Sequence, residues 1–189
     1  MQEEQYIWAQ SPEEIEEQRL GILESIRDSG TIRRMKELGV CPGWRCLEVG
    51  AGRGSIARWL AEQVGSTGHV VATDIDLRFL ERIRASNLEV RLHNVCEEDF
   101  ERSAYDLVHC RALLIHVPRP EEALARMAKA VRSVGGGSSS RRVITGALAR
   151  LILPILGLRS STAQLASSGI SHKQRGSCDL TSAGDSRAS

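Results

Sequence analysis

Three glycines alternate with other residues directly after an acidic position in this chain. Glu48 is followed by Gly50, Gly52 and Gly54, and the apolar run Trp44–Val49 that leads into them is typical of a buried strand. Because glycine lacks a Cβ atom, a chain leaving a strand can turn sharply here and present bare backbone amides to a ligand at the start of a helix. The sequence therefore predicts a nucleotide-type cradle at this turn.

Later apolar runs end on residues that could serve the same ligand. These residues are Asp74, the pair Asn94 and Val95, Cys110 and, in the loop beyond, His116. Ligands of parallel α/β sheets bind at the carboxyl ends of the strands, so we expect these residues to gather around the glycine turn.

Strands and helices alternate along the chain. Strands are predicted at residues 44–49, 69–74, 88–93 and 105–110. Helices are predicted at residues 12–29, at 31–38, from 55 onward, around Leu80 and Ile83, and from Pro120 through Val131 and Val134. This order favours parallel strands, right-handed crossovers and helices on both faces of the sheet. The predicted fold class is α/β, a Rossmann-like doubly wound parallel sheet.

The first predicted helix carries signals for its start, its end and its inward face. Ser11, Pro12 and Glu14 stand in the order of an N-cap, a first-turn proline and a capping-box acid, and Gly30 is expected to end the helix. Four apolar residues share one face and are expected to point inward: Ile15, Ile22, Leu23 and Ile26.

The spacing of the glycines separates two classes of Rossmann-like protein. A dinucleotide site requires G-x-G-x-x-G, but here the third glycine comes one residue early, at Gly54, and Ser55 takes the expected position. The E-x-G-x-G-x-G run together with Asp74 resembles motifs I and II of class I S-adenosylmethionine-dependent methyltransferases. Over residues 6–137 the chain is similar to the small-molecule methyltransferases of the ubiquinone/menaquinone type.

The resemblance implies S-adenosyl-L-methionine as cofactor and assigns the glycine turn to its methionine end. Gly50 and Gly52 would approach the methionine part, Gly54 completes the turn, and Glu48 would help to hold the ammonium group. The substrate implied is a small-molecule methyl acceptor, with His116 as the candidate general base.

The resemblance also assigns residues to the adenosine end. Asp74 would accept both ribose hydroxyls, and Ile75 would lie against the adenine. Before Val95 the family usually has an aspartate that takes the adenine amino group; here Asn94 can accept only through a neutral carbonyl oxygen. Cys110 would fall near the methyl donor.

Simpler roles stay open for several of these residues. Asp74 could cap the following segment, His116 could pack or meet solvent, and Cys110 could be small core filler. A non-catalytic cofactor-binding remnant is the alternative function, and the glycine spacing disfavours an NAD-dependent oxidoreductase.

Composition limits the class of protein. The net charge of +1 over 189 residues predicts neither a nucleic acid nor a membrane partner. Five cysteines without C-x-x-C spacing, and no signal sequence ahead of them, favour a cytoplasmic setting and no metal site. We expect a helical lead or lid at residues 1–43, a cofactor-binding core at 44–137 and an atypical tail at 138–189.

The tail differs from the rest of the chain. Residues 138–189 carry 12 serines and no aromatic residue, whereas seven aromatic residues precede them. Where the family continues with an apolar fifth strand, this chain reads Gly-Gly-Ser-Ser-Ser-Arg, which a one-base shift of a family-like coding run would produce. The hypothesis is a truncation or a change of reading frame between Val131 and Gly137, with residues 143–158 as a short helix or loosely docked segment and the sheet incomplete after its fourth strand.

Overall fold

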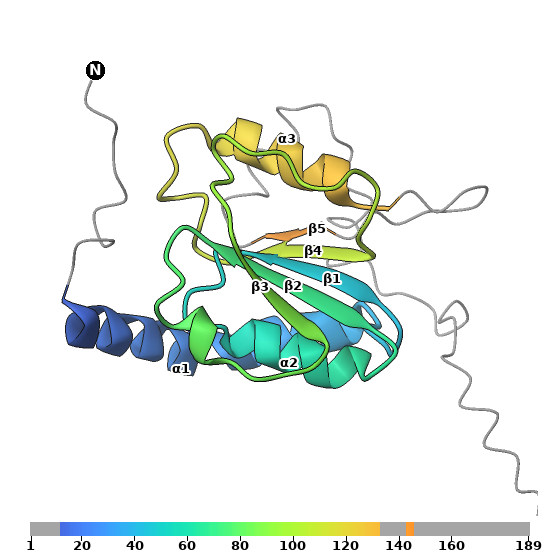
Figure 1. Cartoon of the computed structure of the whole chain (residues 1–189), viewed down its shortest axis with the longest axis horizontal. Coiled ribbons are helices and arrows are strands. Elements are labelled where there is room, and N and C mark those ends of the chain that lie inside the picture. The colour runs from blue at the N-terminus through green and yellow to red at the C-terminus, as the bar shows by residue number, and fades with distance from the viewer. Residues whose placement is uncertain (1–11, 133–142, 146–189) are drawn as a thin grey trace, which may run out of the picture.

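The structure is a computed structural model that describes residues 12–132 and the backbone of residues 143–145. Its elements are α1 (Glu13–Glu37), β1 (Arg45–Val49), α2 (Ser55–Val64), β2 (His69–Asp74), the 3-10 turn η1 (Leu80–Arg82), β3 (Leu88–Leu92), β4 (Leu107–Cys110), α3 (Pro120–Ala130) and β5 (Val143–Thr145). The strands form one parallel sheet in the order β3-β2-β1-β4-β5. Helices α1 and α2 cover one face and α3 the other (Figure 1). The predicted α/β doubly wound sheet is confirmed.

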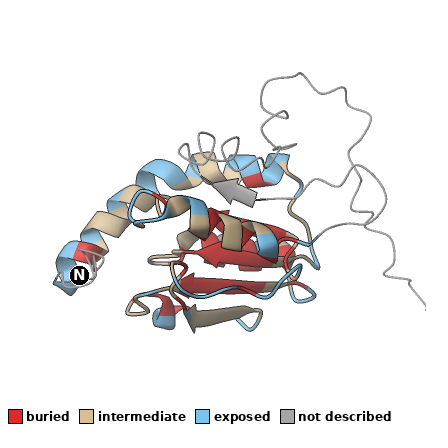
Figure 2. Ribbon diagram, turned by 90° about the horizontal axis from the view of Figure 1, so that it is seen from above, coloured by how far each residue is buried: buried red, intermediate tan, exposed pale blue. Residues whose placement is uncertain are grey.

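Alternation along the strands builds two apolar clusters, one on each face of the sheet. In β1, Cys46 faces the cluster under α1 and α2, whereas Leu47 faces the cluster under α3. Buried residues are therefore concentrated in the central strands (Figure 2). Full burial of a side chain such as Leu47 contributes about 1.5–3 kcal/mol, so both faces help to hold the sheet.

Helix α1 is one continuous helix of 25 residues, and the predicted end at Gly30 is wrong. A glycine in a helix interior costs about 1 kcal/mol but does not break the backbone hydrogen bonds. Beyond Gly30, Ile32 and Met35 pack into the cluster under α2, and this tertiary burial offsets that cost. The predicted N-cap, Ser11, lies outside the described residues.

The inward face predicted for α1 is also wrong. Ile15, Ile22 and Ile26 are 54%, 59% and 68% exposed, and Leu23 is half-buried. The opposite side of the helix faces the body and carries acidic side chains that pair with arginines of the core. Charge pairing, rather than burial of the isoleucines, therefore orients the first half of α1.

The helix predicted around Leu80 and Ile83 is reduced to the single turn η1. Asp76 explains part of this difference, because its side chain accepts the Arg78 N–H at 3.1 Å. Such a local side-chain hydrogen bond offers the backbone an alternative to a helical turn. Leu80 and Ile83 are nevertheless buried, as expected of core residues.

Two differences lie near the end of the described chain. Helix α3 ends at Ala130 instead of continuing to Val134, because Val131 is extended and pairs with Tyr105 beside β4. Val134 lies outside the described residues. The segment Val143–Thr145, predicted as helix or loosely docked chain, is instead the short strand β5, parallel to β4. Three β-branched residues suit a strand, and the open edge of β4 offers unpaired backbone groups to it.

Candidate functional site

The glycine turn has the geometry that its sequence predicts. Gly50, Gly52 and Gly54 all have positive φ, at 69°, 58° and 76°. The Gly50 N–H donates to the carbonyl oxygen of Thr73 at 2.8 Å, which ties the turn to the end of β2. Helix α2 begins directly after the turn, at Ser55.

The third glycine is required by packing. A Cβ atom at Gly54 would lie 2.3 Å from Ile83 Cδ1 and 2.9 Å from Leu80 Cδ2. These distances are shorter than any real carbon contact, so Gly54 lets α2 start close to the η1 region. Its role concerns the fold of the turn and does not require a ligand.

Two leucines that sequence reasoning missed lie beside the other glycines. A Cβ atom at Gly50 would be 3.0 Å from Leu113 Cδ1, and one at Gly52 would be 3.4 Å from Leu20 Cδ2. Leu113 comes from the loop after β4, and Leu20 comes from α1. Helix α1 therefore contacts the glycine turn directly, although nothing in its own sequence indicated that partner.

Asp74 joins the end of β2 to the glycine turn. Its Oδ2 accepts the Gly52 N–H at 2.8 Å, and its Oδ1 accepts the Asp76 N–H at 3.1 Å. Burial raises the pKa of the Asp74 carboxyl, while these backbone hydrogen bonds act in the opposite direction. The structure thus brings together the two motifs that the sequence paired. A carboxylate beside a glycine turn at the carboxyl edge of the sheet fits a ligand with vicinal hydroxyl groups.

Apolar side chains are exposed next to this carboxylate. Ile75 is 43% exposed, and Leu92, the register partner of Asp74 on β3, is 64% exposed. Exposed apolar side chains at this edge of the sheet offer surface against which a flat aromatic ligand could pack. Leu92 was missed because the alternation of the third strand gives no sign that its last residue is uncovered.

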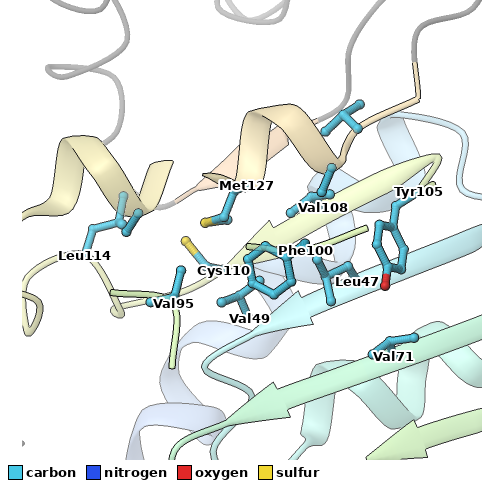
Figure 3. Close-up of a cluster of buried hydrophobic side chains, with 13 residues drawn as sticks. Leu47, Val49, Val71, Val95, Phe100, Tyr105, Val108, Cys110, Leu114 and Met127 are labelled. Atoms are coloured by element: carbon cyan, nitrogen blue, oxygen red, sulfur yellow. The ribbon is translucent and has the colours of Figure 1, made fainter. Parts of the chain in front are cut away.

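The residues after β3 form a compact turn. The Asn94 Oδ1 accepts the Cys96 N–H at 3.0 Å, and the Asn94 N–H donates to Glu98 Oε1 at 2.8 Å. A carbonyl oxygen has two lone pairs, so Asn94 can still accept from a ligand. The side chain of Val95 lies in the apolar cluster under α3 (Figure 3).

Cys110 is placed as core filler at the end of β4. Its side chain is 1% exposed and lies near Met127 and Val49 in the apolar cluster (Figure 3). Burial raises the pKa of its thiol, with the charge of Glu48 acting in the same direction. A neutral buried thiol is a poor nucleophile, so a reacting role for the Cys110 side chain is disfavoured.

Glu48 and His109 form a buried pair that the sequence did not indicate. The two residues are register partners on β1 and β4, and Oε2 of Glu48 lies 2.7 Å from Nδ1 of His109. Both side chains are at least 96% buried. Their sequence separation of 61 residues left no local signal of this contact.

His116 lies in the loop between β4 and α3. Its N–H donates to the carbonyl oxygen of Leu113 at 2.9 Å, so the loop that carries it also covers Gly50. Partial burial lowers the pKa of the imidazole, Arg19 of α1 acts in the same direction, and Glu16 opposes them. The neutral ring is the form that a general base requires near pH 7.

Three arginines around the site hold α1 in place. They follow the carboxyl ends of three strands and meet acids on α1: Arg53 with Glu24 at 3.4 Å, Arg82 with Glu17 at 3.6 Å, and Arg111 with Asp28 at 2.6 Å. Single exposed pairs contribute little, about 0–1 kcal/mol, but together they orient the helix across the glycine turn.

The comparisons with known proteins agree with this geometry. A family model described as "Methyltransferase domain" matches residues 46–135. The chain is 34% identical over 106 residues to a ubiquinone/menaquinone biosynthesis C-methyltransferase UbiE from Cupriavidus necator, covering 52% of this chain and 43% of the relative. It is 29% identical over 102 residues to the tRNA (adenine(58)-N(1))-methyltransferase catalytic subunit TRM61 from Cryptococcus neoformans, covering 50% of this chain and 23% of that protein.

A solved structure shares the fold. The S-adenosylmethionine-dependent methyltransferase from Aquifex aeolicus aligns with a TM-score of 0.53 at 19% identity, over 66% of this chain and 77% of that one. The chain spans less than half the length of the curated relatives named above.

The comparisons also bear on the predicted partners. Because one relative is named for tRNA, the prediction that nucleic acid is not a partner has no support from them. Within residues 12–132, no helix is long and apolar enough to cross a membrane. The resemblance seen in the sequence is confirmed: residues 46–135 match the model of a methyltransferase domain, and the fold is that of a solved S-adenosylmethionine-dependent methyltransferase.

Proposed function

We propose that this chain binds S-adenosylmethionine at the carboxyl edge of its sheet and serves methyl transfer to a small-molecule acceptor. The observation that carries the proposal is the contact between Asp74 and Gly52, which unites the two cofactor motifs at one place. When bound, the cofactor supplies an electrophilic methyl group that an O, N or C nucleophile takes from the sulfonium sulfur by in-line displacement.

The residues of the turn and of β2 would bind the two ends of the cofactor. Gly50 and Gly52 would lie along its methionine part, and Glu48 would face its ammonium group. Asp74, whose two backbone hydrogen bonds leave acceptor sites on both oxygens, would accept the ribose hydroxyls, and Ile75 would cover one side of the adenine. Asn94, at the end of β3, would accept from the adenine amino group.

The acceptor side would be formed by α1 and the loop after β4. Leu20 of α1 lies over the turn, so residues 1–43 would act as a lid that excludes water. Holding nucleophile and methyl group in line can supply about 7–11 kcal/mol of the barrier, and His116 would add deprotonation where the acceptor needs it. The similarity to the UbiE protein supports a small acceptor.

The test is a calorimetric titration of S-adenosylhomocysteine into the full chain and its Asp74→Ala variant. Loss of charge-assisted hydrogen bonds, each about 1.5–3 kcal/mol, should lower the affinity at least tenfold. Asp76→Ala is the matched control, because the Asp76 carboxylate pairs with Arg78 and not with the turn. The proposal would be overturned if the folded Asp74→Ala variant bound S-adenosylhomocysteine as tightly as the unchanged chain does. Binding of NAD but not of S-adenosylhomocysteine would also overturn it.

A further inference from the structure

The Glu48–His109 pair sits at the entrance of the glycine turn. Glu48 precedes Gly50 by two residues, and its own carbonyl oxygen accepts the Thr73 hydroxyl at 3.3 Å, inside the network that shapes the turn. The pair lies on the face of the sheet that α1 and α2 cover, as the alternation along β1 requires. A titratable pair so close to the cofactor motif needs a physical explanation.

The contact fixes the proton of the imidazole. An ionised carboxylate can only accept hydrogen bonds, so Nδ1 of His109 must donate to Oε2 of Glu48. A ring that donates in this way fixes the orientation of the carboxylate. Packing at 3% and 4% side-chain exposure leaves neither residue free to rotate away.

Glu48 has capacity to spare for a ligand. His109 contacts Oε2, and because a carboxylate has about four acceptor sites, Glu48 can accept further hydrogen bonds beside this one. Hydrogen bonds between an ionised acceptor and a cationic donor are about twice as strong as neutral ones, so a cationic donor from a ligand would be favourable there. A buried polar pair kept for stability alone gains little over an apolar pair of the same shape.

We propose that His109 is a positioning residue that holds Glu48 for the ammonium group at the methionine end of the cofactor. The inference rests on the proposed function, because it assumes that S-adenosylmethionine occupies the site. His109 contacts the carboxylate of Glu48 and not the cofactor, so it acts on cofactor binding through Glu48.

The test compares two ligands that differ at the methionine end. S-adenosylhomocysteine carries the ammonium group, whereas 5′-methylthioadenosine ends at the sulfur and lacks it. In the full chain, His109→Leu should weaken the binding of S-adenosylhomocysteine about 10- to 100-fold and change the affinity for 5′-methylthioadenosine less than about twofold. Binding of the shorter ligand also reports that the variant is folded.

Conservative variants separate positioning from packing. The side-chain amide of Asn can donate close to the place of Nδ1, so His109→Asn should bind S-adenosylhomocysteine within about threefold of the unchanged chain. Glu48→Gln, like His109→Leu, should lose the preference for S-adenosylhomocysteine over 5′-methylthioadenosine. The double variant should bind S-adenosylhomocysteine no more weakly than Glu48→Gln alone, because the two changes remove the same interaction.

Three results would overturn the inference. An equal loss for both ligands in His109→Leu, or no loss for either, would make the pair merely structural. Failure of a folded His109→Asn variant to recover affinity would exclude positioning by a hydrogen bond. If the unchanged chain binds neither ligand, the proposed function is wrong as well. This result differs from the three above, in which the unchanged chain still binds S-adenosylhomocysteine.

Discussion

Gly39 and Gly54 share one backbone conformation but differ in what surrounds them. Both have φ of +76°, a region that residues with a Cβ atom adopt at a cost of about 1–2 kcal/mol. Nothing lies within 4 Å of a Cβ atom at Gly39, whereas Ile83 and Leu80 fill that space at Gly54. The two positions therefore separate the cost of conformation from the cost of packing.

The prediction is that Gly54→Ala destabilises the chain by about 1–3 kcal/mol more than Gly39→Ala does. Gly54→Ala loses stability through backbone strain and through overpacking against Ile83, whereas Gly39→Ala loses stability through strain alone. Urea denaturation followed by circular dichroism measures both free energies of unfolding. Equal losses would mean that Ile83 moves aside without cost.

Among the elements, α1 departs most from its sequence signals. Acidic residues of its first half face the body, Ile15, Ile22 and Ile26 are exposed, and Gly30 lies in the helix interior. The structure explains this by contacts far away in the chain, since Arg111 of the loop after β4 pairs with Asp28 at 2.6 Å. Local pattern and tertiary contact compete here, and the tertiary contact decides the orientation.

Because Gly30 lies in the interior of the continuous helix α1, we predict that Gly30→Ala stabilises the protein by about 0.5–1 kcal/mol. Alanine restricts the unfolded chain and favours the helix, and no atom lies within 4 Å of the added Cβ. Gly21→Ala is the matched control, because its Cβ atom would lie 2.5 Å from Arg53 Nη1 and so disturb the ion pair with Glu24. Thermal and urea unfolding of both variants provide the measurement. Destabilisation by Gly30→Ala would show that the helix ends there after all.

For the whole molecule, the open question is what completes the sheet beyond β4. Strand β5 pairs with residues 108–110 of β4 through only three residues. The change of reading frame is hypothesised between Val131 and Gly137, and residues 133–142 and 146–189 lie outside the described chain. A parallel sheet of this class needs its strands covered on both faces, and the neighbour of β4 borders the site.

We predict that restoring the alternative reading frame after Val131 raises methyl transfer about 100-fold over the chain as printed. A full strand beside β4 would fix the loop that carries His116 more firmly than the three residues of β5 do, and a misplacement of about 1 Å can cost that factor. Both chains would be expressed and compared for solubility and for S-adenosylhomocysteine production with a panel of phenolic and quinol acceptors. If the printed chain is equally soluble and active, residues 138–189 complete a working site.

Sequence alone determined the core of the fold because its signals are local. The strand ending at Asp74 matched its predicted bounds, since a run of buried residues followed by an acid is encoded within six positions. The glycine turn could also be predicted, because the tolerance of positive φ that Gly50, Gly52 and Gly54 use is an intrinsic property of glycine. The order of strands and helices then implied parallel pairing.

Only the tertiary structure decided which side chains meet across that frame. His109 looked like an ordinary strand residue, and its pairing with Glu48 depends on the register of two strands 61 residues apart. Leu20 reaches Gly52 because arginines at the edge of the sheet turn α1 toward the body. The physical reason is the same in each case: hydrophobic periodicity specifies which face a residue prefers, whereas burial and charge pairing between distant segments specify which partner it finds.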